Sequence, residues 1–223
     1  MKKLIIWLFG GLLILGMVQE STAVTRVARR WNALEFYSGG AIPWGTYNGI
    51  NPFDFVINNR LVDVDADKVY DPSFYLGVNY GQLISGRFFV SFGFRYTDVN
   101  ALDSILLPLD SVLIFDPSLS WNQYDIDINA NVYFADISRS PFAPYVGVGL
   151  GVGINSLTSD LFDTENQATA ALRANFGFDL KLFSSGHRSF VTLSSVNSWD
   201  VLVSDDRPKY INIGGALKYW FKM

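Results

Sequence analysis

The sequence contains no cysteine among its 223 residues, so it offers no thiol for a disulfide, a thiolate metal site or a lipid-modified anchor. Positive charge is also scarce. Seventeen basic residues face 21 acidic ones, and the formal net charge of −4 argues against nucleic acid as a partner. After residue 23 no uninterrupted apolar run is long enough to cross a bilayer as a helix. The hydrophobic residues after residue 23 must therefore belong to a secondary structure other than a membrane-spanning helix.

The first 23 residues have the pattern of an export signal. Two lysines precede an apolar stretch (residues 4–18) that is short for a spanning helix, and small residues ending at Ala23 suit a signal peptidase. We expect residues 1–23 to be a cleaved signal peptide. Residues 24–223 would then form the mature domain, with a charge of about −5. A retained helical anchor is the alternative interpretation.

Hydrophobic residues in the rest of the chain alternate with small or polar ones, which is the period of a strand with two unlike faces. The last segment, residues 210–221, puts isoleucine, leucine and aromatic residues on one face and asparagine, glycine, alanine and lysine on the other. The same analysis predicts eight strands: 32–43, 72–82, 87–98, 121–135, 142–155, 168–183, 189–201 and 210–221.

Two of these strands have special features. Because of its serines, strand 189–201 has polar and apolar residues on both faces. We expect Val191, Leu193 and Trp199 to face outward. Strand 142–155 has glycine at four successive inward positions, 147, 149, 151 and 153. Such glycines are expected to leave room for bulky side chains from the opposite wall of a closed sheet.

Connections between the predicted strands alternate between long and short, which is typical of outer-membrane barrels. The predicted fold is an all-β, antiparallel, up-and-down transmembrane β-barrel of about eight strands, with short turns and both the N- and C-termini on the periplasmic side. A soluble β-sandwich is the main competitor. The strand lengths and the aromatic residues that end the apolar faces favour the barrel.

Two segments carry a family resemblance: P-Y-V-G-V-G-L-G-V-G (residues 144–153) and the terminal strand to Phe221. They resemble small outer-membrane barrels of the OmpA/OmpX type, over nearly all of the mature chain. The resemblance implies a Gram-negative outer membrane, contact with lipid and lipopolysaccharide, and a barrel-assembly machinery that reads terminal aromatics, here Tyr219 and Phe221. Lys222 and Met223 follow Phe221, whereas the family usually ends on its aromatic.

Eight charged residues are predicted to face the lumen, four acidic and four basic: Glu35, Arg95, Asp125, Asp127, Arg173, Asp179, Lys181 and Lys218. Isolated charges in a narrow lumen would be costly, so they should pair. Arg95 and Asp125 lie on hairpin neighbours, and Glu35 and Lys218 lie on the strands that must meet to close the barrel. We expect a polar core that fills the lumen. A narrow passive channel gated by these ion pairs is the alternative.

The predicted outer connections are acidic and could meet an extracellular ligand. Asp63, Asp65 and Asp67 have the D-x-D-x-D spacing that opens a calcium loop. Lys68 and Phe74 stand where that loop needs Gly and Glu, which excludes an EF-hand. A loose cation site that bridges lipopolysaccharide phosphates stays open. The sequence calls for no cofactor and no resident metal.

The only histidine, His187, lies two residues before Ser189. Some barrel enzymes that deacylate lipid A use a His-x-Ser pair together with a carboxylate. Here the pair falls near a predicted periplasmic turn, and no carboxylate lies in an obvious orienting position. The sequence therefore favours a non-enzymatic structural or surface-interaction role over modification of lipid A.

Overall fold

The structure, a computed structural model, describes residues 31–44, 46–47, 56–57, 60–61, 64–65, 72–99, 104–107, 111–114, 120–159, 162–185, 188–203 and 209–222. Eight long strands form one closed antiparallel barrel, which confirms the predicted fold class. The barrel strands are β1 (Trp31–Pro43), β6 (Ser73–Leu83), β7 (Phe88–Val99), β10 (Ser120–Tyr133), β11 (Phe142–Ser159), β12 (Phe162–Ser185), β13 (Ser189–Val203) and β14 (Tyr210–Lys222).

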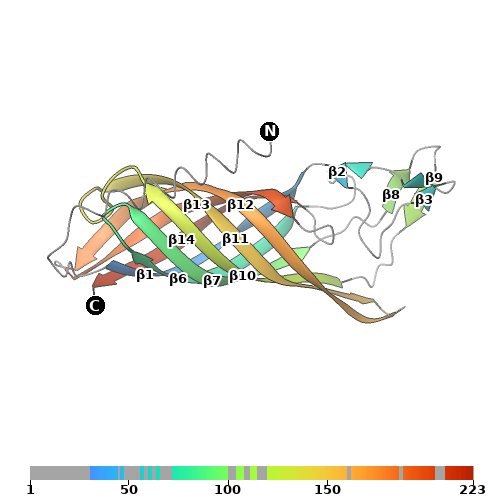
Figure 1. Cartoon of the computed structure of the whole chain (residues 1–223), viewed down its shortest axis with the longest axis horizontal. Helices are drawn as coiled ribbons and strands as arrows, with labels where there is room; N and C mark the ends of the chain where they lie inside the picture. The colour runs from blue at the N-terminus through green and yellow to red at the C-terminus, as the bar shows by residue number, and fades with distance from the viewer. Residues whose placement is uncertain are drawn as a thin grey trace.

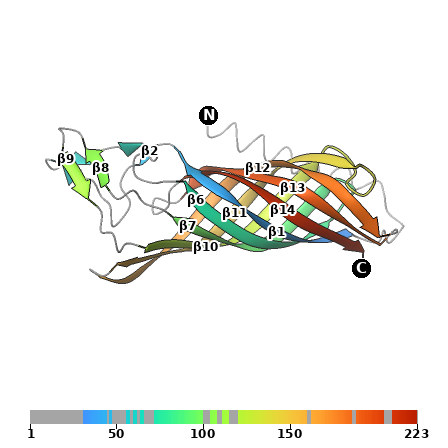
Figure 2. The same ribbon diagram turned by 180° about the vertical axis from the view of Figure 1, so that it is seen from behind.

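Each barrel strand pairs with its neighbours in the chain, so the sheet is an up-and-down meander (Figures 1 and 2). Closure comes from β1 and β14, which pair from Trp31 opposite Lys222 to Pro43 opposite Tyr210. The start of β1 and the end of β14 therefore lie at the same end of the barrel. We name this the short-turn end, because short turns join β6 to β7, β10 to β11 and β12 to β13 there.

Six short strands lie beyond the other end of the barrel (Figure 1). They form three two-stranded sheets from β2 (Thr46–Tyr47), β3 (Val56–Ile57), β4 (Arg60–Leu61), β5 (Val64–Asp65), β8 (Ser104–Leu107) and β9 (Ser111–Ile114). The paired ends of β11 and β12 also extend past the barrel on this side (Figure 1). These two strands are 18 and 24 residues long, longer than predicted, because they continue as a hairpin.

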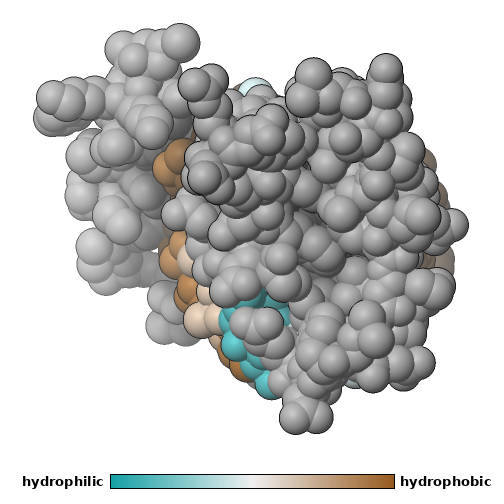
Figure 3. Space-filling view, turned by 90° about the vertical axis from the view of Figure 1, so that its right-hand side faces the viewer, coloured by the Kyte–Doolittle hydropathy of each residue, from teal (hydrophilic) through white to brown (hydrophobic). Residues whose placement is uncertain are grey.

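The outer face of the barrel is hydrophobic. Large apolar side chains alternate with buried ones along each strand, and Phe36, Ile128 and Leu217 are more than half exposed. In Figure 3, hydrophobic residues are visible on the flank of the barrel, with a hydrophilic patch at its lower edge. Within the described ranges, no helix has the length and hydrophobicity needed to cross a membrane. The outward faces predicted from sequence alternation are found on nearly every strand.

Strand β13 has the predicted outward face, although one of its residues is covered. Leu193 and Trp199 are exposed as predicted, but Val191 is only 8% exposed. Its pairing partners Phe183 and Tyr219 are both exposed, so Val191 has the outward register and is covered by its neighbours. The pairing of β12 with β13 shifts between Lys181 and Phe183, which brings the bulky Phe183 beside it. Val191, Leu193 and Trp199 therefore face outward as predicted, and Val191 is covered by its neighbours.

The remaining predictions about the chain ends are not addressed by this architecture. The signal peptide, residues 1–23, lies outside the described residues. Which end of the barrel faces the periplasm also stays a prediction.

Candidate functional site: a filled lumen

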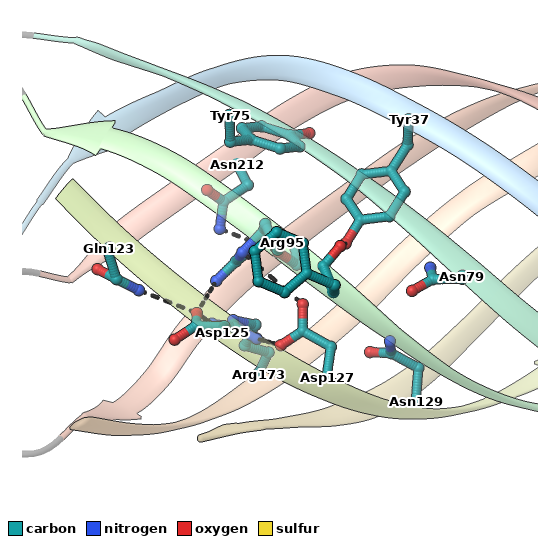
Figure 4. A network of polar contacts seen from close by, with 12 residues as sticks. Tyr37, Tyr75, Asn79, Arg95, Gln123, Asp125, Asp127, Asn129, Arg173 and Asn212 are labelled. Carbon is teal, nitrogen blue, oxygen red and sulfur yellow. Dashed lines mark hydrogen bonds and ion pairs between the residues drawn. The ribbon is translucent and has the colours of Figure 1, made fainter. Parts of the chain in front are cut away.

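A network of five charged side chains occupies the middle of the lumen, and Figure 4 labels all of them except Asp200. Its members, each at most 4% exposed, are Arg95, Asp125, Asp127, Arg173 and Asp200. Arg95 Nη2 lies 2.9 Å from Asp125 Oδ2, and Arg173 Nη2 lies 2.7 Å from the same oxygen. Arg173 also pairs with Asp127 and, through Nε at 2.9 Å, with Asp200. One guanidinium thus joins three carboxylates from two strands, an arrangement suited to its fork of donors.

The glycine positions of β11 make this network possible. Asp127 on β10 and Arg173 on β12 are not on adjacent strands, because β11 lies between them. A Cβ added at Gly151 would lie 2.6 Å from Asp127 Oδ1 and would also meet the Arg173 guanidinium. The missing side chains therefore let β10 and β12 reach each other across β11. The side chains nearest to these glycines belong to the flanking strands, and the use of this room by the opposite wall stays a prediction.

A second charged group lies nearer the short-turn end. Lys218 Nζ is 3.3 Å from both Glu35 Oε1 and Asp179 Oδ1, and all three residues are buried. Tyr133 donates a 2.9 Å hydrogen bond to Asp179, and Asn79 donates one of 3.1 Å to Glu35. Hydrogen bonds to the ionised forms help to offset the cost of burying these carboxylates.

A small polar cavity of about 50 Å³ lies between the two charged groups. Its lining includes Glu35, Asn79, Arg95 and Asp127, together with the rings of Tyr37 and Tyr75. Among the described residues, no group makes a hydrogen bond to Asn79 Oδ1 or Arg95 Nε. A cavity of this size and polarity has room for a few water molecules, which can bind those two atoms. The cavity is too small for a larger solute.

The short-turn end of the lumen is closed by an apolar plug. We use this name for six residues that pack inside that end: Leu83, Phe89, Tyr133, Ile137, Phe190 and Trp220. Trp220 stacks on Phe190 with ring centroids 5.6 Å apart and contacts Phe89 at 5.2 Å. Ile137 comes from the β10–β11 turn and is fully buried, so the turn itself folds into the barrel mouth.

Lys218 connects the plug to the charged groups. Its ammonium lies 5.4 Å from the Phe89 ring centroid and 5.6 Å from that of Trp220. The aromatic faces attract a cation and add to the contacts with Glu35 and Asp179. The plug therefore continues directly into the lysine-centred group, and the small cavity separates that group from the arginines.

The structure places seven of the eight predicted lumen residues inside the barrel. It brings together both expected pairs, Arg95 with Asp125 and Glu35 with Lys218, and adds Asp127, Arg173 and Asp179 to them. Lys181 differs. It is half-buried at the short-turn end and donates a 2.8 Å hydrogen bond to the backbone oxygen of Ser138. Lys181 is therefore not a member of a lumen ion pair among the described residues.

Sequence analysis missed Asp200 and the lumen tyrosines. Asp200 is fully buried, binds Arg173 and accepts a hydrogen bond from the backbone nitrogen of Tyr210. The mixed faces of β13 concealed its orientation, although counting by twos from Thr192 would have placed it inward. Tyr37 and Tyr75 lie at inward positions. Alternation predicts which side chains point inward, but not that large rings occupy the lumen.

The other predicted sites are placed as follows. Tyr219 is 47% exposed on the outer face, and its ring stacks on Phe221 with centroids 5.6 Å apart. Asp63 and Asp67 lie outside the described residues, as does His187, and only the backbone of Asp65 is described. The described part of the chain holds no group of three or more His, Cys, Asp or Glu side chains arranged for a metal ion.

Neither a family model nor a curated protein matches the chain. Solved structures do match. OprG, an outer membrane protein from Pseudomonas aeruginosa, has a TM-score of 0.52 at 15% identity, over 86% of this chain and 96% of that one. Neisserial surface protein A has a TM-score of 0.46 at 13% identity, over 86% and 97% of the two chains. Together with the strand order, the match to OprG shows that the chain has the fold of the small eight-stranded outer-membrane barrels.

Proposed function

We propose that this chain is an integral outer-membrane barrel of a Gram-negative bacterium with a closed lumen and a structural or surface-interaction role. The observation that carries the proposal is the filled lumen. An apolar plug, a lysine-centred group and an arginine-centred group follow one another along the axis, with only a cavity of about 50 Å³ between the charged groups. An eight-stranded barrel has an interior that side chains can fill.

Membrane insertion is supported by the outer face. Its exposed side chains include Phe36, Phe92, Ile128 and Leu150, which would be costly to leave in water. Every barrel strand pairs on both sides, so no edge of the sheet is left open. A closed sheet satisfies its backbone groups internally, as a bilayer requires. Tyr219 and Phe221 at the end of β14 support recognition by the barrel-assembly machinery.

A closed barrel leaves the connections that follow β1 and β7 as the parts able to meet a partner. The short strands β2 to β5, β8 and β9 lie at that end, away from the short turns (Figure 2). We propose that this end faces the cell exterior, in contact with lipopolysaccharide or an extracellular ligand. The proposed role involves no catalysis.

A labelling experiment in intact cells tests this proposal, because the chain has no cysteine to interfere. Ser111→Cys places a thiol on β9, and Arg139→Cys places one on the 88% exposed side chain of the β10–β11 turn. A membrane-impermeant maleimide should label the first and spare the second, and both should react in lysed cells. If only Arg139→Cys were labelled in intact cells, the barrel would have the opposite orientation to the one proposed. Recovery of the protein outside the outer-membrane fraction would refute the proposal.

A further inference from the structure

The apolar outer belt is interrupted on three adjacent strands, β13, β14 and β1. Pairing aligns Ser195 with Gly215 and Gly215 with Ser38, while Asn197 aligns with Ile213 and Ile213 with Gly40. We name these six residues the belt patch. The rows on either side of it are wholly apolar: Trp199, Ile211 and Ile42 on one side, and Leu193, Leu217 and Phe36 on the other.

The fold does not require glycine at the two glycine positions of the belt patch. A Cβ added at Gly40 would come no closer than 3.9 Å to another atom, and one at Gly215 no closer than 3.7 Å. Their inward-facing neighbours differ. A Cβ at Gly39 would lie 2.6 Å from the Gly214 Cα, and one at Gly214 would collide with the Tyr75 hydroxyl. The inward glycines are needed by the barrel itself, whereas the outward ones leave its surface bare.

Asn197 gives the belt patch unused hydrogen-bonding capacity. Its Nδ2 donates to Ser195 Oγ at 2.9 Å and to the Phe176 carbonyl at 3.3 Å. No donor from the described residues contacts Asn197 Oδ1. The pairing partner Phe176 is 45% exposed on the outer face, so Asn197 has the outward register, at the surface that would contact lipid. Hydrocarbon chains have no donor to offer it, and an unsatisfied polar group in that environment is costly.

We propose that the belt patch is an interface between two copies of this chain in the membrane. Small residues let two backbones approach closely within a bilayer, and polar side chains supply hydrogen bonds between them. A twofold axis through the patch brings identical surfaces together, so the serine hydroxyls of one copy face the Asn197 oxygen of the other. Ile213, 53% exposed at the centre, then packs over Gly40 and Gly215 of the second copy. This inference rests on the proposed membrane location.

Association can be measured by energy transfer between copies labelled at Arg139→Cys and diluted in phospholipid vesicles. Heat-modifiable migration on a gel first establishes that the barrel has inserted. The native chain should show dimers that persist at low protein-to-lipid ratio. Asn197→Leu and Gly215→Leu should each shift the monomer–dimer equilibrium about tenfold toward monomer, because one removes the polar contact and the other blocks close approach.

Ala130→Leu is the matched control. Ala130 lies on the outer face of β10, four strands from β14 on the opposite wall, and pairs with Val90 and Val148. This variant should dimerise like the native chain. Monomers throughout, with normal insertion, would overturn the proposed interface while leaving the membrane location intact. An equal effect of all three leucine variants would overturn it as well, and failure of insertion would count against the membrane location instead.

Discussion

The two parts of the lumen are closed by different chemistry. At the short-turn end, the plug packs aromatic and aliphatic side chains around Trp220, which is fully buried. In the middle, Arg173 joins three carboxylates through hydrogen-bonded ion pairs. Apolar contacts are non-directional and lose stability in proportion to the volume removed. A buried charge network is less tolerant, because removing one member leaves the others without compensation. Substitutions in the charge network should therefore lower the unfolding free energy more than substitutions in the plug.

The largest expected effect is that of Arg173→Met. The change leaves Asp125, Asp127 and Asp200 with one arginine between them, and the expected loss is about 3–5 kcal/mol of unfolding free energy. Urea titration in detergent, followed by tryptophan fluorescence, would measure it. Lys181→Met is the control on the same strand, because Lys181 is half-buried and lies outside the charged network, with a backbone oxygen and the Phe190 ring as its contacts. Equal losses in the two variants would contradict the central role of Arg173.

Ile137→Ala tests the plug. Ile137 is fully buried although it lies in a turn, so truncation should cost about 2–4 kcal/mol. Ile84 lies in the neighbouring short turn and is 38% exposed, which makes Ile84→Ala the matched control, with an expected loss below about 1 kcal/mol. The same urea titration applies. If both variants behaved alike, the turn would not be part of the plug.

Gly151→Ala tests the contact across β11. The added methyl group would collide with Asp127 and Arg173, which can move only by weakening their ion pair, and we expect a loss of about 1–3 kcal/mol. Gly40→Ala adds the same group where the nearest atom is 3.9 Å away. It should leave the stability of the detergent-solubilised monomer unchanged or slightly raised. A destabilised Gly40→Ala beside an unaffected Gly151→Ala would refute the proposed role of the β11 glycines.

The smallest expected effect is that of Tyr133→Phe, at the boundary of the two regions. The ring contributes to the plug, and its hydroxyl donates to Asp179 and accepts from Lys218 at 3.3 Å. Removing the hydroxyl alone should cost about 1–2 kcal/mol, since a hydrogen bond to a charged group is lost. Urea unfolding compared with Tyr145→Phe would check this, because the Tyr145 hydroxyl donates to a backbone oxygen at 3.2 Å. A smaller loss for Tyr133→Phe than for Tyr145→Phe would contradict it.

Much of this architecture could be predicted from the sequence, because period-two alternation specifies both the strands and their faces. The inward position of Arg95 and Asp125 on neighbouring strands was enough to predict their contact. The link from Asp127 to Arg173 could not be predicted in the same way, because it crosses an intervening strand. Pairing rules describe neighbouring strands only, and the reach of two long side chains over glycine is a three-dimensional property.

The plug was equally difficult to predict. Phe89 and Trp220 are large apolar residues at inward positions, where alternation leads one to expect small or polar ones. Ile137 lies in a turn, a location that usually means solvent exposure. The plug becomes apparent only when the end of the barrel brings residues of five strands and a turn together. Asp200 was missed because serines make both faces of β13 look alike, although alternation from the buried Thr192 places it inward.

The most direct test of the closed lumen is single-channel recording of the refolded protein in a planar lipid bilayer, after heat-modifiable migration has shown that the barrel is folded. The filled lumen predicts insertion without discrete conductance steps, because the plug and the two charged groups block the axis and the cavity between the charged groups is about 50 Å³. Stable, reproducible steps from the native chain would contradict this account and would mean that the lumen conducts.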